Sequence, residues 1–136
     1  MHLNPYLTFD GRCEEAFRFY EKLLGGKITA MMPHEGTPAA EHAPQDWQKK
    51  ILHAVLNIDG QILMGSDAPP QHYEPPKGIS VSLNAGKVAD AERVFEALAA
   101  KGEVQFPLQQ TFWAARFGMA TDRFGIPWMI NCEKDG

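Results

Sequence analysis

The sequence predicts an α+β fold in which two tandem modules each follow the element order βαβββ. Each half of the chain contains one segment whose apolar residues recur at helical spacing. In each half a short β-rich run precedes that segment, and three further β-rich runs follow it, the last two of them joined by a turn. The matched order and spacing indicate an internal duplication within a single domain of residues 1–136.

The first module covers about residues 1–67 and begins with a strand that ends in the turn Asp10-Gly11. A helix follows, with apolar residues at i, i+3, i+4, i+7 and i+8, and Gly25-Gly26 ends it. Asp59-Gly60 joins the last two strands and is one of the strongest two-residue hairpin signals. The expected elements are a strand at Pro5–Phe9, a helix with the stripe Ala16, Phe19, Tyr20, Leu23 and Leu24, and strands at Lys27–Met32, Ile51–Ile58 and Gln61–Ser66.

Two segments have no hydrophobic period. His34–Lys50 is polar and contains Trp47, which predicts a long surface loop of a kind that is often functional. Residues 68–78 are rich in proline, which is typical of a connector between the modules.

The second module covers about residues 79–136 and repeats the pattern. Its helix ends at Gly102, and its hairpin turn is expected at Asp122-Arg123-Phe124-Gly125. The expected elements are a strand at Ile79–Leu83, a helix with the stripe Val88, Ala91, Val94, Phe95 and Leu98, and strands at Val104–Phe106, Arg116–Thr121 and Ile126–Cys132. Between the modules, Ala16 aligns with Ala91, Tyr20 with Phe95, Leu23 with Leu98, Gly60 with Gly125 and Met64 with Met129.

Charge and apolar content exclude several classes of partner. The net charge of −4 is spread along the chain, and no short window carries a Lys/Arg cluster that would neutralise phosphates, so we expect no nucleic-acid partner. The uncharged stretches are too short to span a bilayer and no leader pattern is present, so we expect no membrane partner and a cytoplasmic location. Cys13 and Cys132 lack zinc-ligand spacing and are expected to be free thiols.

Three segments together resemble the PhnB-like branch of the vicinal oxygen chelate superfamily, which includes glyoxalases, bleomycin-resistance proteins and dioxygenases. They are NPYLTFDGRCEEAFRFYEKLLGG, ILHAVLNIDGQILMGSD and QTFWAARFGMATDRFGIPWMIN, and the resemblance covers nearly the whole chain. It implies a glyoxalase-like fold in which each module bends its four strands into a cup with the helices outside. It also implies a small-molecule cleft formed by the two modules and usually completed by a homodimer.

The resemblance also implies where a superfamily metal ion would be bound, at four positions on the first and last strand of each module. These positions fall on Pro5, Met64, Ser80 and Met129. Hard divalent cations prefer carboxylate or carbonyl oxygen, and borderline cations add imidazole or thiolate, so these four residues do not fit. We therefore expect no metal site of the superfamily type.

Members of this branch sometimes carry a methyltransferase label. The sequence has no glycine-rich turn that follows a strand and opens a helix, with an acidic residue further on, because Gly25-Gly26 follows a helix instead. We therefore expect no cofactor.

His53 is the best candidate for a polar residue in the cleft. A two-residue turn pairs Val55 with Met64. It also pairs His53 with Ser66, and directly paired residues share a face, so His53 is expected to face the cleft. Imidazole titrates near neutral pH, which makes His53 a candidate acid, base or anion partner. The alternative is a histidine satisfied by backbone or hydroxyl hydrogen bonds.

Arg116 is the candidate cation of the cleft. An even-length turn in the second hairpin places it on the same face as Met129 and Asn131. Its planar guanidinium suits a carboxylate or phosphate on a ligand, and a salt bridge to Asp122, Glu133 or a dimer partner is the alternative.

The aromatic residues of the second module divide into two groups. Phe112 and Trp113 are candidates for an aromatic wall of the ligand site, with core or dimer packing as the alternative. Strand alternation points Trp128 away from Met129 and toward the helix-packed layer, so Trp128 is expected to be structural.

The sequence favours a protein that binds a small molecule in a mostly apolar cleft, or a metal-independent enzyme, and no residue pattern indicates a reaction. One alternative is a protein that sequesters an antibiotic or a metabolite unchanged. A divalent-metal lyase or dioxygenase, or a methyltransferase, is favoured less. The expected ligand-binding residues are His53, Met64, Ser80, Trp113, Arg116, Met129 and Asn131.

Overall fold

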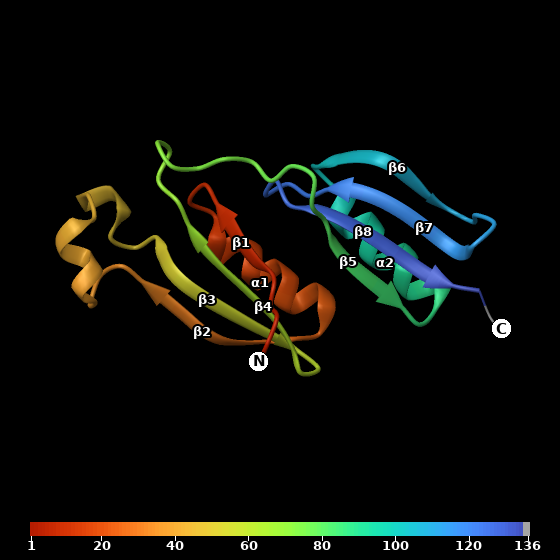
Figure 1. Cartoon of the computed structure of the whole chain (residues 1–136), viewed down its shortest axis with the longest axis horizontal. Helices are drawn as coiled ribbons and strands as arrows, with labels where there is room; N and C mark the ends of the chain where they lie inside the picture. Colours follow the sequence, from red (N-terminus) through yellow and green to blue (C-terminus); the bar gives the residue numbers. More distant parts are fainter. Residues whose placement is uncertain (135–136) are drawn as a thin grey trace. The chain divides into compact units, whose positions relative to one another are not determined.

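Each half of the chain folds into a four-stranded mixed sheet that carries one helix (Figure 1). This architecture is seen in a computed structural model that describes residues 1–134. The chain divides into two units, Met1–Glu74 and Pro75–Gly136, whose sheets we call sheet A and sheet B. The predicted α+β class and the order βαβββ in each module are confirmed.

In sheet A the strand order is β1-β4-β3-β2, with β1 parallel to β4 and the other pairs antiparallel. The hairpin turn is the predicted one, because Ile58 pairs with Gln61 across Asp59-Gly60, and both turn residues have positive φ. The elements of unit 1 are β1 (Tyr6–Phe9), α1 (Cys13–Leu24), β2 (Lys27–Pro33), the 3₁₀ helices Pro38–His42 and Gln45–Trp47, β3 (Ile51–Ile58) and β4 (Gln61–Asp67).

Sheet B repeats the same topology in the order β5-β8-β7-β6, again with the first and last strands of the unit parallel. The first strand begins at Val81, two residues later than predicted, so Ser80 lies just before it. The elements of unit 2 are β5 (Val81–Ala85), α2 (Val88–Ala99), β6 (Glu103–Gln109), β7 (Ala114–Thr121) and β8 (Pro127–Glu133).

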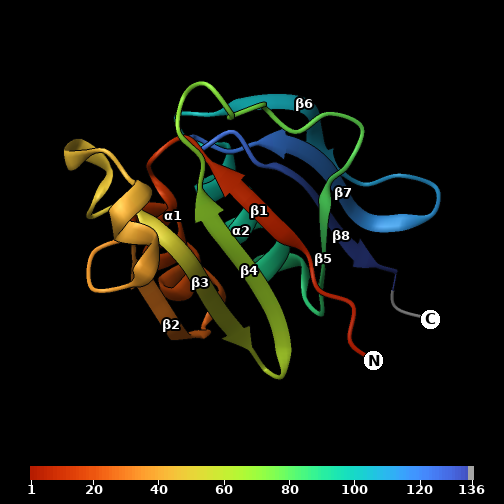
Figure 2. The ribbon, with the colours of Figure 1, turned by 60° about the vertical axis from the view of Figure 1, so that its left-hand side comes forward.

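Each helix covers one face of its own sheet, α1 mainly over β3 and α2 mainly over β7 and β8 (Figures 1 and 2). On α2 the predicted residues Ala91, Val94, Phe95 and Leu98 are buried. On α1 the predicted stripe is wrong in part, because Phe17 is fully buried while Phe19 is only half-buried. The buried stripe begins one turn earlier than predicted and consists of Cys13, Ala16, Phe17 and Tyr20.

A buried carboxylate joins three separate segments of unit 1. Asp67, at the end of β4, is 8% exposed. Its Oδ1 accepts hydrogen bonds from the backbone N–H groups of Gly11 (3.0 Å) and Cys13 (2.9 Å). Its Oδ2 accepts one from the N–H of Ile51 at 2.9 Å. The side chain therefore connects the start of α1 to the start of β3.

A second buried carboxylate closes the hairpin of unit 2. The Oδ1 of Asp122 accepts hydrogen bonds from the N–H groups of Phe124 (2.9 Å) and Ile126 (3.0 Å), and its Oδ2 accepts one from the indole of Trp128 (2.9 Å). Thr121 pairs with Pro127, so five residues form the connection. The predicted turn Asp122-Arg123-Phe124-Gly125 is therefore one residue too short, because Ile126 also belongs to the connection.

The segment His34–Lys50 is more ordered than a simple loop, because side chains and backbone satisfy one another within it. The Nδ1 of His34 lies 2.8 Å from the backbone oxygen of Lys50, and Gln48 donates from Nε2 to the backbone oxygens of Ala40 and Ala43. Lys50 donates to the backbone oxygen of Gly11 at 2.9 Å, which attaches the segment to the β1–α1 connection.

Both cysteines are buried free thiols. Burial raises the pKa of the Cys13 thiol, and the negative charges of Asp67 and Glu14 raise it further. Cys13 is therefore a packing residue and is not activated by the start of α1.

In residues 1–134 no helix is both long enough and apolar enough to cross a membrane.

Candidate functional site

The face of sheet B that α2 leaves open carries the side chains of a candidate ligand site. Cross-strand partners share a face, and Met119 pairs with Met129 on the neighbouring strand. The intervening residue Trp128 points the other way and is 2% exposed, which confirms the prediction that it is structural. Its partner Ala120 is likewise buried.

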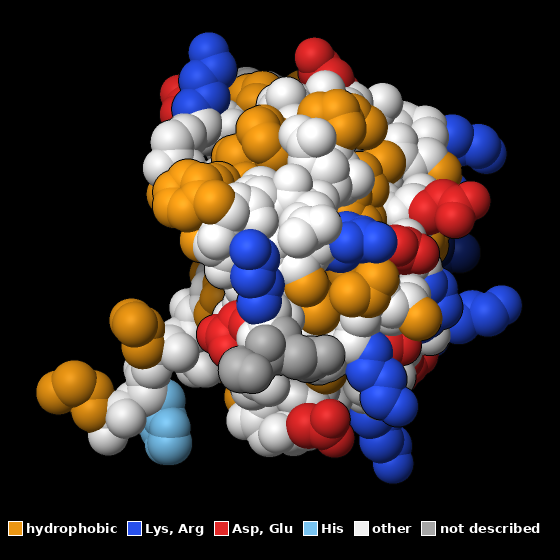
Figure 3. Space-filling model, turned by 90° about the vertical axis from the view of Figure 1, so that its right-hand side faces the viewer, with side chains coloured by type: hydrophobic (Ala, Val, Ile, Leu, Met, Phe, Trp, Pro, Cys, Tyr) orange, Lys and Arg blue, Asp and Glu red, His pale blue; other side chains and the backbone are white. Residues whose placement is uncertain are grey.

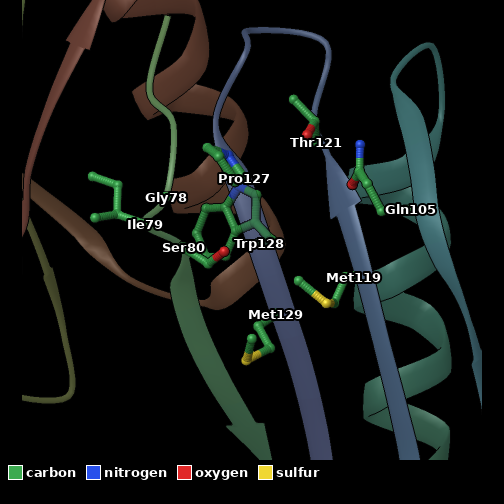
Figure 4. Close-up of a pocket in the computed structure, with 9 residues that line it drawn as sticks. All are labelled: Gly78, Ile79, Ser80, Gln105, Met119, Thr121, Pro127, Trp128 and Met129. Atoms are coloured by element: carbon green, nitrogen blue, oxygen red, sulfur yellow. The ribbon is translucent and has the colours of Figure 1, made fainter.

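A cavity of about 560 Å³ lies on this open face (Figure 4). Figure 4 shows the thioethers of Met119 and Met129 on neighbouring strands, with Ser80 on one side and Gln105 and Thr121 on the other. The lining is mostly apolar, and its polar groups are two hydroxyls and one amide. The nine lining residues are Gly78, Ile79, Ser80, Gln105, Met119, Thr121, Pro127, Trp128 and Met129.

Aromatic side chains continue the open face beyond the cavity. Phe117 pairs with Asn131 and shares the face of Met119. The ring of Trp113 contacts Phe117 edge-on at 5.4 Å between centroids, and Phe112 contacts Trp113 at 4.8 Å. Phe112 and Trp113 are 88% and 50% exposed, so they form a surface and not a core. In Figure 3 hydrophobic side chains gather in the upper part of the face shown, and charged side chains surround them.

Asn131 lies on the open face of sheet B, as predicted. It pairs with Phe117 on one side and with Asn84 on the other. Its Nδ2 donates to Oδ1 of Asn84 at 3.0 Å. The two amides thus satisfy part of their hydrogen-bonding capacity with one another.

The expected position of Arg116 is wrong. Arg116 pairs with Cys132, so it lies on the face covered by α2 and not on the face of Met129. Its Nε donates to Oε1 of Glu92 on α2 at 3.3 Å, and its Nη1 donates to the backbone oxygen of Ala115 at 2.7 Å. The error comes from the turn, because an odd number of connecting residues exchanges the faces of β7. Arg116 does form a salt bridge, as the alternative expected, but its partner is Glu92 and not Asp122 or Glu133.

The same turn explains which lining residues the sequence reasoning missed. With five connecting residues, Thr121 and Met119 move onto the face of Met129. Gln105 lay inside the predicted strand Val104–Phe106 but was missed because the register of β6 is irregular between Val104 and Phe106, so simple alternation does not give its face. The signal available in the sequence was Asp122, whose carboxylate can cap a longer turn.

In unit 1, His53 lies on β3 beside Met32 of β2. The predicted pairing of Val55 with Met64 is confirmed, and Met64 also pairs with Tyr6 of β1. The hydroxyl of Tyr6 lies 3.3 Å from Nδ1 of His53, and the two rings stack at 5.9 Å with an angle of 24°. Tyr6 is 49% exposed. A hydroxyl group is thus a partner of His53, as the alternative interpretation expected, although it belongs to Tyr6.

The positions where a superfamily metal would be bound do not carry suitable donors. The first-strand residues paired with Met64 and Met129 are Tyr6 and Ser82, one or two residues beyond the expected Pro5 and Ser80. Two hydroxyls and two thioethers are not the ligand set that hard or borderline divalent cations prefer. Within residues 1–134 no group of three or more His, Cys, Asp or Glu side chains is arranged to hold a metal ion.

Comparisons with known proteins give one consistent result. Residues 2–130 match the model of the Glyoxalase/Bleomycin resistance protein/Dioxygenase superfamily. Protein YjdN of Escherichia coli strain K12 is 38% identical over 142 residues, which cover 98% of this chain and 97% of YjdN. The name YjdN states no substrate.

Two solved structures show the same fold over nearly the whole chain. Protein PA1353 from Pseudomonas aeruginosa is 51% identical with a TM-score of 0.90, and 99% of each chain is covered. The PhnB protein from Bacillus cereus, for which a 3-demethylubiquinone-9 3-methyltransferase activity has been suggested, is 22% identical with a TM-score of 0.83, covering 97% of this chain and 99% of that one. At that identity the second likeness shows the fold alone.

Proposed function

Because the chain belongs to the glyoxalase/bleomycin resistance protein/dioxygenase superfamily, we propose that it binds a small organic molecule in the cavity of sheet B. The cavity itself carries the proposal. Ligand pockets usually enclose about 300–1,000 Å³ and are mostly apolar with a few polar groups, and this cavity fits both criteria. The binding step needs no metal ion, since the donor set described above does not fit one.

The apolar and the polar side chains of the cavity lining have different roles in ligand binding. Met119 and Met129 supply adaptable thioether surface, which tolerates ligands of different outline. Ser80, Gln105 and Thr121 supply hydrogen-bond donors and acceptors that fix orientation. Trp113, through Phe117, extends the surface for a longer ligand, and Asn131 adds an amide beside it.

A bulky side chain at Ser80 is expected to abolish ligand binding. Ser80 is exposed and precedes β5, so Ser80→Trp fills the cavity without disturbing the core. Melting temperatures measured against a metabolite and drug panel should rise for the wild type. Those increases should disappear in Ser80→Trp and persist in Ala89→Trp, a control on the exposed surface of α2. Equal shifts in both variants would show that the cavity is not the site.

We propose binding without conversion, because none of the nine lining residues carries an ionisable side chain that could transfer a proton. This matches the alternative of a sequestering protein. A ligand that raises the melting temperature is expected to be recovered unchanged after prolonged incubation with the protein. The homodimer and the cytoplasmic location expected from the sequence stay predictions.

His53 is proposed as a polar contact for ligands on the open face of sheet A. Its half-buried imidazole lies beside the exposed Tyr6, and Met64 provides apolar surface on the same face. Panel compounds whose melting shift survives Ser80→Trp are expected to bind about fivefold more weakly to His53→Ala, since one ligand hydrogen bond is lost. His72→Ala, in the exposed connector, is the control. If Ser80→Trp abolishes every shift, this second site is excluded.

A further inference from the structure

We infer that the cavity of sheet B selects uncharged organic molecules and discriminates against ions of the same shape. This inference rests on the proposed function and deepens it, because it names the charge class of the ligand. It follows from the ionisable groups around the cavity and from what each of them contacts.

The lining offers no counter-charge to an ionic ligand. Its three polar side chains are neutral, and the amide of Gln105 and the hydroxyls of Ser80 and Thr121 each both donate and accept hydrogen bonds. The other lining residues are glycine, proline, isoleucine, tryptophan and two methionines, none of which carries a charge. A charged group seated there gives up water without gaining an opposite charge, whereas an amide or hydroxyl group exchanges water for equivalent partners.

Two charged groups on or beside β7, Asp122 and Arg116, already have partners. Asp122 follows Thr121 in the hairpin turn of unit 2. Its Oδ1 accepts hydrogen bonds from the backbone of that turn, and its Oδ2 accepts one from Trp128. Arg116 lies on the opposite face of β7 and pairs with Glu92. Neither group is directed at a ligand in the cavity.

Two exposed charges at the rim have opposite signs. Glu103 pairs with Thr121 across β6 and β7, and Lys77 directly precedes Gly78. Both side chains are exposed, and water and salt screen such charges strongly. We therefore expect them not to reverse the preference of the cavity for neutral ligands. The variant Glu103→Gln, which removes one of these two charges, is the control.

Three planar probes of one shape test the inference directly: 2-naphthamide, 2-naphthoate and 2-naphthamidine, which are neutral, anionic and cationic at neutral pH. Isothermal titration calorimetry with the wild type is expected to give a Kd for the amide at least tenfold below the Kd of either ion. The same order is expected in Glu103→Gln. An ion that binds as tightly as the amide overturns the inference.

A charge placed in the cavity should reverse the preference. Met129→Lys keeps an unbranched side chain of similar length and adds an ammonium group to the lining. Naphthoate is expected to bind at least tenfold more tightly to Met129→Lys than to the wild type. The neutral control Met129→Leu should keep the wild-type order. An unchanged order in Met129→Lys, with the variant folded by circular dichroism, contradicts the inference.

The outcomes separate this inference from the proposed function. If naphthoate binds the wild type as well as naphthamide does and Ser80→Trp abolishes both, the cavity is the site and only the charge class is wrong. If none of the three probes binds, the inference fails. The proposed function then fails as well only if the panel compounds bind Ser80→Trp as they bind the wild type.

Discussion

Asp67→Ala is expected to lower the free energy of unfolding by about 3–5 kcal/mol, because it leaves two buried backbone N–H groups and one part-buried one without their acceptor. The carboxylate is 8% exposed, so water cannot replace it without opening the β1–α1 connection. The affected N–H groups belong to Gly11 and Cys13, at the start of α1, and to Ile51, at the start of β3. Loss of this one side chain therefore loosens the start of α1 and the start of β3 together.

Urea unfolding followed by circular dichroism measures this effect. Asp67→Asn should cost roughly half as much, because its amide keeps one acceptor oxygen for the Oδ1 pair and loses the bond to Ile51. Asp46→Ala is the matched control, since Asp46 is exposed in the second 3₁₀ helix, and it should change stability by less than about 0.5 kcal/mol. An Asp67→Ala variant as stable as Asp46→Ala would show that the three hydrogen bonds contribute little.

Gly118→Ala is expected to destabilise unit 2 by about 2–3 kcal/mol through overpacking between sheet B and α2. A Cβ on Gly118 would lie 2.8 Å from Cε2 of Phe95 and 2.9 Å from the Cα of Leu108. Phe95 is buried on α2, and the Leu108 atom belongs to the backbone of β6. Neither neighbour can move without shifting a whole element, so the strain is not relieved locally.

The control for this change lies in the same unit. A Cβ on Gly86 would meet nothing within 4 Å, and Gly86 is not among the residues with positive φ. Gly86→Ala should therefore be neutral or slightly stabilising, because alanine restricts the unfolded chain. Thermal unfolding of the two variants should differ clearly in midpoint. If Gly118→Ala and Gly86→Ala unfold at the same midpoint temperature, the space between α2 and sheet B accepts the added methyl group without strain.

Much of the fold was predictable because it rests on local patterns. The Asp59-Gly60 turn fixed the register of β3 against β4, so the face shared by Val55 and Met64 followed directly. The α2 stripe followed from helical spacing. The duplication was visible because both modules place similar elements in the same order.

The candidate site was less predictable because faces depend on counting residues through a turn. One additional connecting residue after Thr121 moved Arg116 to the α2 side and brought Met119 beside Met129. The order within His34–Lys50 was also hidden, since it depends on single side chains such as Gln48 bonding to backbone oxygens, which gives no hydrophobic period. Tyr6 was missed as the partner of His53 because 47 residues separate them.

The two buried aspartates differ in how far their hydrogen-bond donors lie from them along the sequence. The contacts of Asp122 span two to six residues, so they can form as soon as the local hairpin closes, on a timescale of about 1–10 μs. Two contacts of Asp67 span 54 and 56 residues, so the chain must close long loops before that carboxylate finds its donors. Two copies of one topology thus use their buried carboxylates differently, one within a local turn and one between segments that are distant in the sequence.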